Sequence, residues 1–189
     1  MLKMIRGIIP LRFAFYLAAL GMYHWLEYLY VSLYHYSILN FDSKINYSLF
    51  NYSGYLINQS WAYGVAIFVS FFESFINYYF ASIDPFNLLE YFGPTSYLIV
   101  GLGLVMVILG QILRTTAEMT AASNFHHQVR YRRDPKHELV TKGVYQISRH
   151  PSYLGWYIWA VGTQVMMMNI VSTIFFIITS WFFFSDRIP

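Results

Sequence analysis

The feature that most constrains this chain is a series of long apolar runs separated by short polar segments. The clearest run, at 97–114, reads YLIVGLGLVMVILGQILR and has no acidic residue. A helix needs about 20 apolar residues to cross the hydrocarbon core of a bilayer. Across the 189 residues, 57% are hydrophobic and only 11% are charged, well outside the usual range of soluble domains. The sequence therefore predicts an all-α integral membrane protein.

The breakers between the runs divide the chain into about five membrane helices within a single domain, 1–189. Asp84-Pro85 and Gly93-Pro94 interrupt the apolar pattern, and Asn169 alone separates the last two runs. So short a separation predicts an antiparallel C-terminal helical hairpin. The expected helices cover about 13–36, 55–80, 97–124, 153–168 and 170–184, with an irregular loop at 125–152.

Ionisable residues inside the apolar runs are few, and each is expected to face other helices. His24 and Glu27 lie at i,i+3 on one helical face; they form either an interhelical hydrogen-bonded clasp or part of a site. Arg114 and Glu118 are spaced for an i,i+4 ion pair. The Gly-Leu-Gly at 101–103 lies in mid-run with no preceding strand, which favours close helix packing over a nucleotide loop.

Most of the polar chemistry is confined to one segment. It holds seven of the twelve Lys and Arg residues and four of the six histidines: Arg114, Arg130, Arg132, Arg133, Lys136, Lys142, Arg149, His126, His127, His137 and His150. This charge predicts a cytoplasmic face near anionic lipid, and no nucleic-acid partner. The basic residues near the N-terminus would then lie on the opposite side, a conflict that an additional upstream helix would remove.

Several classes of chemistry lack the residues they need. With no cysteine, disulfides, thiolate metal sites and a cysteine nucleophile are excluded. His126 and His127 are adjacent, so they point in different directions, and no carboxylate completes a ligand set. We therefore expect no metal. A Ser/His/Asp triad is not supported either, because no nucleophile elbow is present.

The segment Arg149-His150-Pro151-Ser152-Tyr153 combines groups that suit an anionic ligand. Pro151 fits the first turn of a helix, which places Arg149 and His150 just before free backbone N–H groups. The guanidinium of Arg149 can bind a carboxylate or phosphate, and the tyrosines offer aromatic faces. The alternative is interfacial anchoring, because Arg, His, Tyr and Trp collect at membrane surfaces whatever the function.

HELVTKGVYQISRHPSYLGWYIWAVGTQVMMMN at 137–169 resembles the signature of isoprenylcysteine carboxyl methyltransferases. The likeness extends upstream through LGQILRTTAEMTAASNFHHQV at 109–129 and downstream into FFSDRI at 183–188. The string RHPxY also occurs in phospholipid N-methyltransferases and sterol-type reductases, which remain alternatives on that string alone. Its combination with SNFxH and H-x-LVT-x-GVY is much more specific to the first family.

This resemblance implies methylation of the C-terminal carboxylate of prenylated cysteine in CaaX-processed proteins, in the endoplasmic reticulum membrane, with S-adenosyl-L-methionine as cofactor. The implied partners are prenylcysteine-bearing proteins and membrane lipids. Residues implied to bind the cofactor are His137, Glu138, Leu139, Val140, Gly143, Tyr145, Arg149, His150 and Tyr153. The last three also carry the implied catalytic role, and the implied lipid tunnel comprises Trp156, Trp159 and Met166 to Met168.

The chain departs from the family beyond Asp186-Arg187. Family members continue with a run of glutamates and a basic residue, whereas this sequence stops at Pro189. The expectation is a fragment or truncated product that, without that segment, shows no measurable carboxyl methylation. An inactive membrane-embedded remnant is therefore an alternative to the enzyme.

Overall fold

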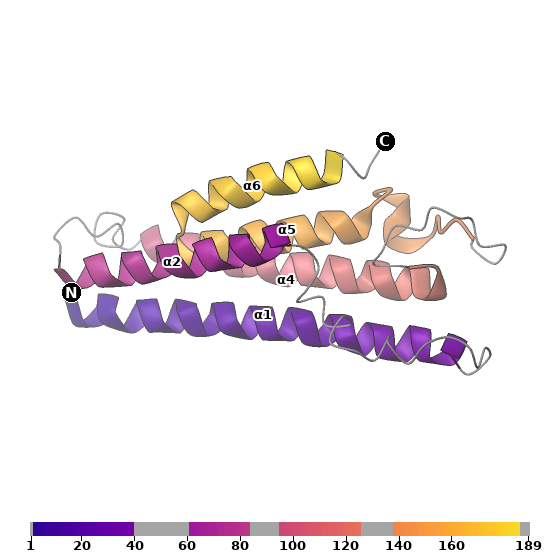
Figure 1. The fold of residues 1–189 in the computed structure, drawn as a ribbon, viewed down its shortest axis with the longest axis horizontal. Helices are drawn as coiled ribbons and strands as arrows, with labels where there is room; N and C mark the ends of the chain where they lie inside the picture. Colours follow the sequence, from indigo (N-terminus) through magenta and orange to yellow (C-terminus); the bar gives the residue numbers. More distant parts are fainter. Residues whose placement is uncertain (1, 40–60, 84–94, 126–137, 186–189) are drawn as a thin grey trace.

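The structure, a computed structural model, describes residues 2–39, 61–83, 95–125 and 138–185. All regular secondary structure in these ranges is helical (Figure 1). Its elements are α1 (Leu2–Leu39), α2 (Trp61–Ile83), α4 (Thr95–Ala121), η3 (Ala122–Asn124), η4 (Gly143–Gln146), α5 (Pro151–Met167) and α6 (Ile170–Ser185). The all-helical prediction is confirmed for the part of the chain described.

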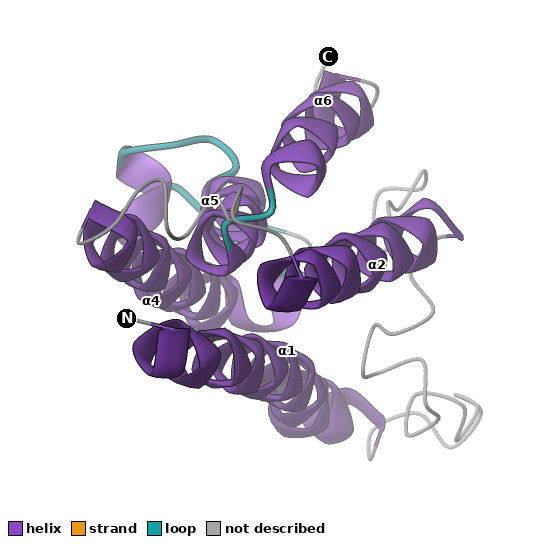
Figure 2. Ribbon diagram, turned by 90° about the vertical axis from the view of Figure 1, so that its left-hand side faces the viewer, coloured by secondary structure: helices purple, strands orange, loops and turns teal. Residues whose placement is uncertain are grey.

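Helix α5 lies at the centre of the bundle, with α4, α6 and α1 packed against it (Figure 2). The start of α1 and the α5–α6 turn lie at one end of the molecule (Figure 1). The 138–150 loop and the end of α6 lie at the other. The last two helices form the antiparallel hairpin that the single Asn169 separator predicts, and the hairpin returns the chain to the end that carries the loop.

Helices α4 and α5 approach so closely that their contact requires glycine. A Cβ added to Gly103 would lie 2.2 Å from the backbone nitrogen of Met166, and one on Gly110 would lie 2.5 Å from that of Trp159. Gly155 and Gly162 make the reciprocal contacts from α5. The predicted packing role of the 101–103 motif thus holds for Gly103 only, because nothing lies within 4 Å of a Cβ on Gly101.

The turn between α5 and α6 is closed by a left-handed residue and backbone hydrogen bonds. Met168 has φ of 59°, and the N–H of Asn169 donates to the carbonyl of Gln164 at 3.0 Å. Asn169 also donates through its side chain to Ser70 O at 3.1 Å and to Ser74 Oγ at 2.9 Å. These bonds tie the turn to α2, so polar groups within the bundle have partners there.

Glu73 on α2 caps the start of α6. Its carboxylate accepts from the backbone N–H of Val171 at 2.9 Å and of Ser172 at 2.7 Å. These N–H groups have no partner within their own helix, and the negative charge suits the helix dipole. The predicted second span contains Glu73, but nothing in the sequence pairs it with a residue almost one hundred positions away.

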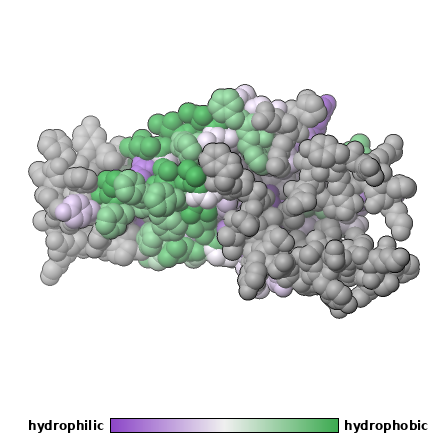
Figure 3. Space-filling model, viewed as in Figure 1, coloured by the Kyte–Doolittle hydropathy of each residue, from purple (hydrophilic) through white to green (hydrophobic). Residues whose placement is uncertain are grey.

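The observed helices differ from the expected ranges mainly at their ends. Helix α1 begins at Leu2 and ends at Leu39, so it is longer than the expected 13–36. Helix α2 is described from Trp61, and the expected start near 55 falls outside the described residues. Of the described residues, one stretch, Thr95–Asn124, is long and apolar enough to cross a membrane, and two apolar helical stretches, Tyr63–Asn77 and Ile170–Ser185, are shorter. Apolar side chains cover much of the described surface in Figure 3. The count of five spans stays a prediction.

Candidate functional site

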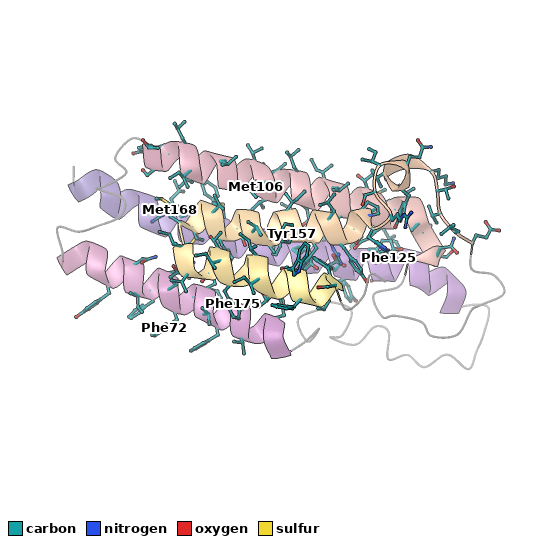
Figure 4. The ribbon with its side chains drawn as sticks, turned by 90° about the horizontal axis from the view of Figure 1, so that it is seen from above. Phe72, Met106, Phe125, Tyr157, Met168 and Phe175 are labelled. Atoms are coloured by element: carbon teal, nitrogen blue, oxygen red, sulfur yellow. The ribbon has the colours of Figure 1, made fainter. Side chains whose placement is uncertain are left out.

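An open cavity of about 230 Å³ lies where the 138–150 loop meets the start of α5. The residues that line it come from the end of α4, η3, the loop and the first turn of α5: Ala121, Asn124, Phe125, Glu138, Leu139, Val140, Tyr145, Arg149, His150, Pro151, Ser152 and Tyr153. Figure 4 shows Phe125 at this end of the bundle and Met168 at the opposite end of α5. The volume is below the ~300–1,000 Å³ typical of ligand pockets.

Two local features hold the loop against α4. The backbone N–H of Glu138 donates to Oδ1 of Asn124 at 3.0 Å, which joins the start of the described loop to η3. Gly143 has φ of +60°, a conformation that glycine adopts at no steric cost, and a Cβ there would lie 3.3 Å from Cγ2 of Thr120. The Lys142-Gly143 pair therefore shapes the turn that leads into η4.

The first turn of α5 presents ring faces and a cation to the cavity. His150 is the N-cap residue, Pro151 occupies the first turn as predicted, and no side chain among the described residues caps the helix. The ring of His150 stacks on that of Tyr153 at 5.7 Å, and Tyr153 stacks on Phe184 of α6 at 5.1 Å. Arg149 and His150 are exposed. Arg149 makes no side-chain hydrogen bond or ion pair within the described ranges.

Burial raises the pKa of the Tyr145 phenol above its ordinary value, and the nearby Glu118 carboxylate raises it further. Tyr145 lies in η4, outside the membrane helices. Its phenol therefore stays protonated at neutral pH and is available as a hydrogen-bond donor beside the cavity.

The structure brings most of the sequence-predicted residues to one cavity. Glu138, Leu139, Val140, Tyr145, Arg149, His150 and Tyr153 all line it. Gly143 acts through the turn and not through the lining, and His137 falls outside the described residues. Asn124, Phe125 and Ser152 also line the cavity, although sequence reasoning gave them no role. Asn124 and Phe125 lie in the SNF string and Ser152 lies in the RHPSY string, so these two motifs could have identified them.

A buried ionic cluster lies directly behind the first turn of α5. Arg114 pairs with Glu27 of α1 and, at 3.2 Å, with Glu118 one turn along α4. Its Nη1 also donates to Oγ of Ser152 at 3.0 Å. The predicted pairing of Arg114 with Glu118 and the clasp interpretation of Glu27 are both confirmed. His24 forms a second interhelical hydrogen bond, with the hydroxyl of Tyr63 on α2 at 3.3 Å, which also fits the clasp.

The five residues of the implied lipid tunnel differ in burial. Trp159 is stacked on Tyr23 of α1 at 4.6 Å, and Met166, Met167 and Met168 are buried within the bundle. Trp156 is half-buried and faces Phe183 and Phe184 of α6, at 6.3 Å and 5.9 Å between ring centroids. Its indole Nε1 is buried and has no hydrogen-bond partner among the described residues. Trp156 is therefore the least buried of these five residues, and it lies beside α6.

A sequence model of the isoprenylcysteine carboxyl methyltransferase (ICMT) family matches residues 102–189. The chain is 40% identical over 177 residues to a protein-S-isoprenylcysteine O-methyltransferase of Dictyostelium discoideum. The matched region covers 93% of this chain and 65% of that protein. It is 39% identical over 176 residues to the Saccharomyces cerevisiae enzyme of that name, covering 93% and 68%. It also resembles the structure of the eukaryotic intramembrane Ras methyltransferase ICMT, with a TM-score of 0.77 and 33% identity over 95% of this chain.

The helical fold has a cavity at one end of its central helix, and the similarities to known proteins extend along nearly all of the chain. The chain belongs to the isoprenylcysteine carboxyl methyltransferase family. It spans 65% of the Dictyostelium relative and 57% of the chain in the solved structure.

Proposed function

We propose that this protein transfers a methyl group from S-adenosyl-L-methionine to the C-terminal carboxylate of a prenylated cysteine. The observation that carries the proposal is the gathering of seven motif residues, from 138 to 153, around one cavity. The cavity opens where α5 begins, beside aromatic side chains that continue onto α6. An ionic cofactor and a lipid chain could thus approach the same helix from two directions.

The donor set suits an amphoteric, aromatic cofactor. The exposed guanidinium of Arg149 and the uncapped start of α5 favour a carboxylate. Tyr145 and Tyr153 offer ring faces for an aromatic base, and the Glu138 carboxylate offers an acceptor for an amine or hydroxyl. When bound, the cofactor would supply an electrophilic methyl group on a sulfonium.

The chain's own residues then act mainly by placement. The acceptor carboxylate is ionised at neutral pH, so the reaction needs little acid–base help. Arg149, His150 and Tyr153 would orient the two reactants, and the stacked rings of His150, Tyr153 and Phe184 would restrict water at the mouth. Orientation of this kind can lower a barrier by ~7–11 kcal/mol.

Trp156 marks where a prenyl chain would lie. Its ring faces Phe183 and Phe184 between α5 and α6, and its buried Nε1 is a donor without a partner in the described ranges. An apolar chain against these rings, with a carbonyl near the indole N–H, would use both features. The substrate would then reach the cavity from the lipid side of the hairpin.

The direct test measures binding of radiolabelled S-adenosyl-L-methionine to the 189-residue chain purified in detergent. We expect saturable binding that unlabelled S-adenosyl-homocysteine displaces and reduced nicotinamide dinucleotide does not. A phospholipid N-methyltransferase would bind the same cofactor, so farnesylcysteine and phosphatidylethanolamine vesicles are compared as second ligands. Absence of cofactor binding, or displacement by the dinucleotide, would overturn the proposal.

We further propose a multi-pass protein of the endoplasmic reticulum, with the cavity on the cytoplasmic face. The basic residues of 114–149 and the return of the hairpin to that end support this orientation. A glycosylation acceptor introduced within 130–136 should stay unmodified in microsomes, and one introduced within 84–94 should be modified. The reverse pattern would contradict the orientation.

A further inference from the structure

The cluster around Arg114 connects three helices at a point that the mechanism above leaves unused. The exposed fractions of Arg114, Glu27 and Glu118 are 4%, 1% and 3%, and none of the three lines the cavity. The guanidinium pairs with both carboxylates and lies over the ring of Tyr23 at 5.4 Å. The cation is held firmly, because removing the arginine would leave two buried carboxylates without a countercharge.

One arm of the same guanidinium reaches the cavity wall. Nη1 of Arg114 donates to Oγ of Ser152, and Ser152 is a lining residue that is 4% exposed. One turn further on, a Cβ on Gly155 would lie 2.6 Å from the backbone nitrogen of Arg114. Both the side chain and the backbone of Arg114 therefore bear on the first turn of α5.

We propose that Arg114 is a positioning residue for methyl transfer. It sets the first turn of α5 through Ser152, and thereby fixes the flanking Arg149, His150 and Tyr153 against the loop. The inference rests on the proposed cofactor site. Arginine is required because its planar fork reaches the carboxylates through Nε and the hydroxyl through Nη1 at once, whereas a lysine offers a single nitrogen.

Arg12 of α1 is a matched control, because it contacts the opposite end of α5. Arg12 is also buried, and its Nη1 donates to the carbonyl of Met167 at 3.0 Å. Arg12→Lys should lower the melting temperature but change the S-adenosyl-L-methionine affinity less than about twofold. Arg114→Lys should weaken that affinity by ~10–100-fold, as expected when charged hydrogen bonds at a site are misplaced. Equal losses in both variants would show a merely structural role and overturn the proposal.

The link through Ser152 has its own test. Ser152→Ala should weaken cofactor affinity by about 5–10-fold, in the range expected for the loss of one typical hydrogen bond. The double variant should lose no more than Arg114→Lys alone, because the two residues act through one contact. Additive losses, or an unchanged affinity in Ser152→Ala, would overturn the proposal. Ser152→Ala also decides the matter should Arg114→Lys not fold.

A readout without cofactor separates this inference from the proposed function. The chain has no cysteine, so Leu154→Cys and Val171→Cys, both exposed positions, each accept a single nitroxide label. In the Arg114→Lys background the label at 154, in the first turns of α5, should gain mobility, and the label at 171 should not. Unchanged mobility at 154 would overturn the positioning role, whereas absent cofactor binding by the parent chain would overturn the proposed function.

Discussion

The two ends of α5 are both polar, yet their polar groups are arranged in opposite ways. At the end of the helix, Gln164 and Asn169 are 0% and 1% exposed and bond to each other and to Ser70 and Ser74 of α2. At the start, Arg149 and His150 are exposed, and Arg149 bonds to no described side chain. In a closed network the polar groups bond to one another, so they hold the helices together but have no free donor or acceptor for a ligand.

This contrast explains how one helix can combine a rigid frame with a reactive surface. The closed end and the α4 contact fix where α5 lies, and the open end then presents charged and aromatic groups at defined positions. A site must hold its functional groups within about 0.5 Å of a productive geometry, which needs such support. Four substitutions test whether stability and ligand binding separate along the helix in this way.

The largest effect should come from Gly110, in the close contact between α4 and α5 that supports both ends of α5. Gly110→Ala places a Cβ 2.5 Å from the backbone of Trp159, so α4 and α5 must move apart. We expect a loss of about 2–4 kcal/mol in stability, measured by thermal unfolding in detergent, together with weaker cofactor binding. The matched variant is Gly101→Ala, which meets nothing within 4 Å and should stabilise the helix by up to ~1 kcal/mol. Equal melting temperatures for the two variants would contradict the close α4–α5 packing.

Asn169→Ala should affect the closed end alone. It removes donors to Ser70 O and Ser74 Oγ inside the bundle, so each of these two buried atoms loses one hydrogen bond. We expect destabilisation of about 2–3 kcal/mol. Cofactor affinity measured well below the melting temperature should stay within a factor of two. A large loss of affinity would mean that the two ends are not separable.

Arg149→Ala should affect the open end alone. The side chain is exposed and makes no bond to a described residue, so its removal should shift the melting temperature by less than a degree or two. Cofactor affinity should fall by about 1.5–3 kcal/mol, the range of a hydrogen bond to a charged group. Titration with the labelled cofactor measures this change. An unchanged affinity with poor expression would instead favour interfacial anchoring.

The smallest effect should come from the cap of α6. Glu73→Gln keeps the size of the side chain but removes the charge that faces Val171 N and Ser172 N. We expect a loss of about 1 kcal/mol in stability, seen as a small shift in thermal unfolding, and unchanged cofactor binding. Because Gln has nearly the same size as Glu, a much larger shift in melting temperature would contradict a role limited to capping.

The sequence by itself determined the helical class, the C-terminal hairpin and most of the lining of the cavity. Apolar length and breakers carry the first two, because a membrane helix must satisfy its own backbone and a one-residue separator leaves no room for a crossover. Nine of the twelve lining residues lie within two short stretches, 138–145 and 149–153, so a local motif could identify them. Gly143 and Pro151 also follow from local backbone preferences.

Only the tertiary structure decided which distant groups meet. Glu27 pairs with Arg114, and Glu73 caps α6, across separations of 87 and 98 residues. Apolar periodicity cannot rank such partners, because any buried acid needs some donor and the sequence offers several. Likewise Gly101 and Gly103 look alike in the sequence, yet only Gly103 meets α5. The rotation of one helix about its axis separates them, and packing against neighbouring helices sets that rotation.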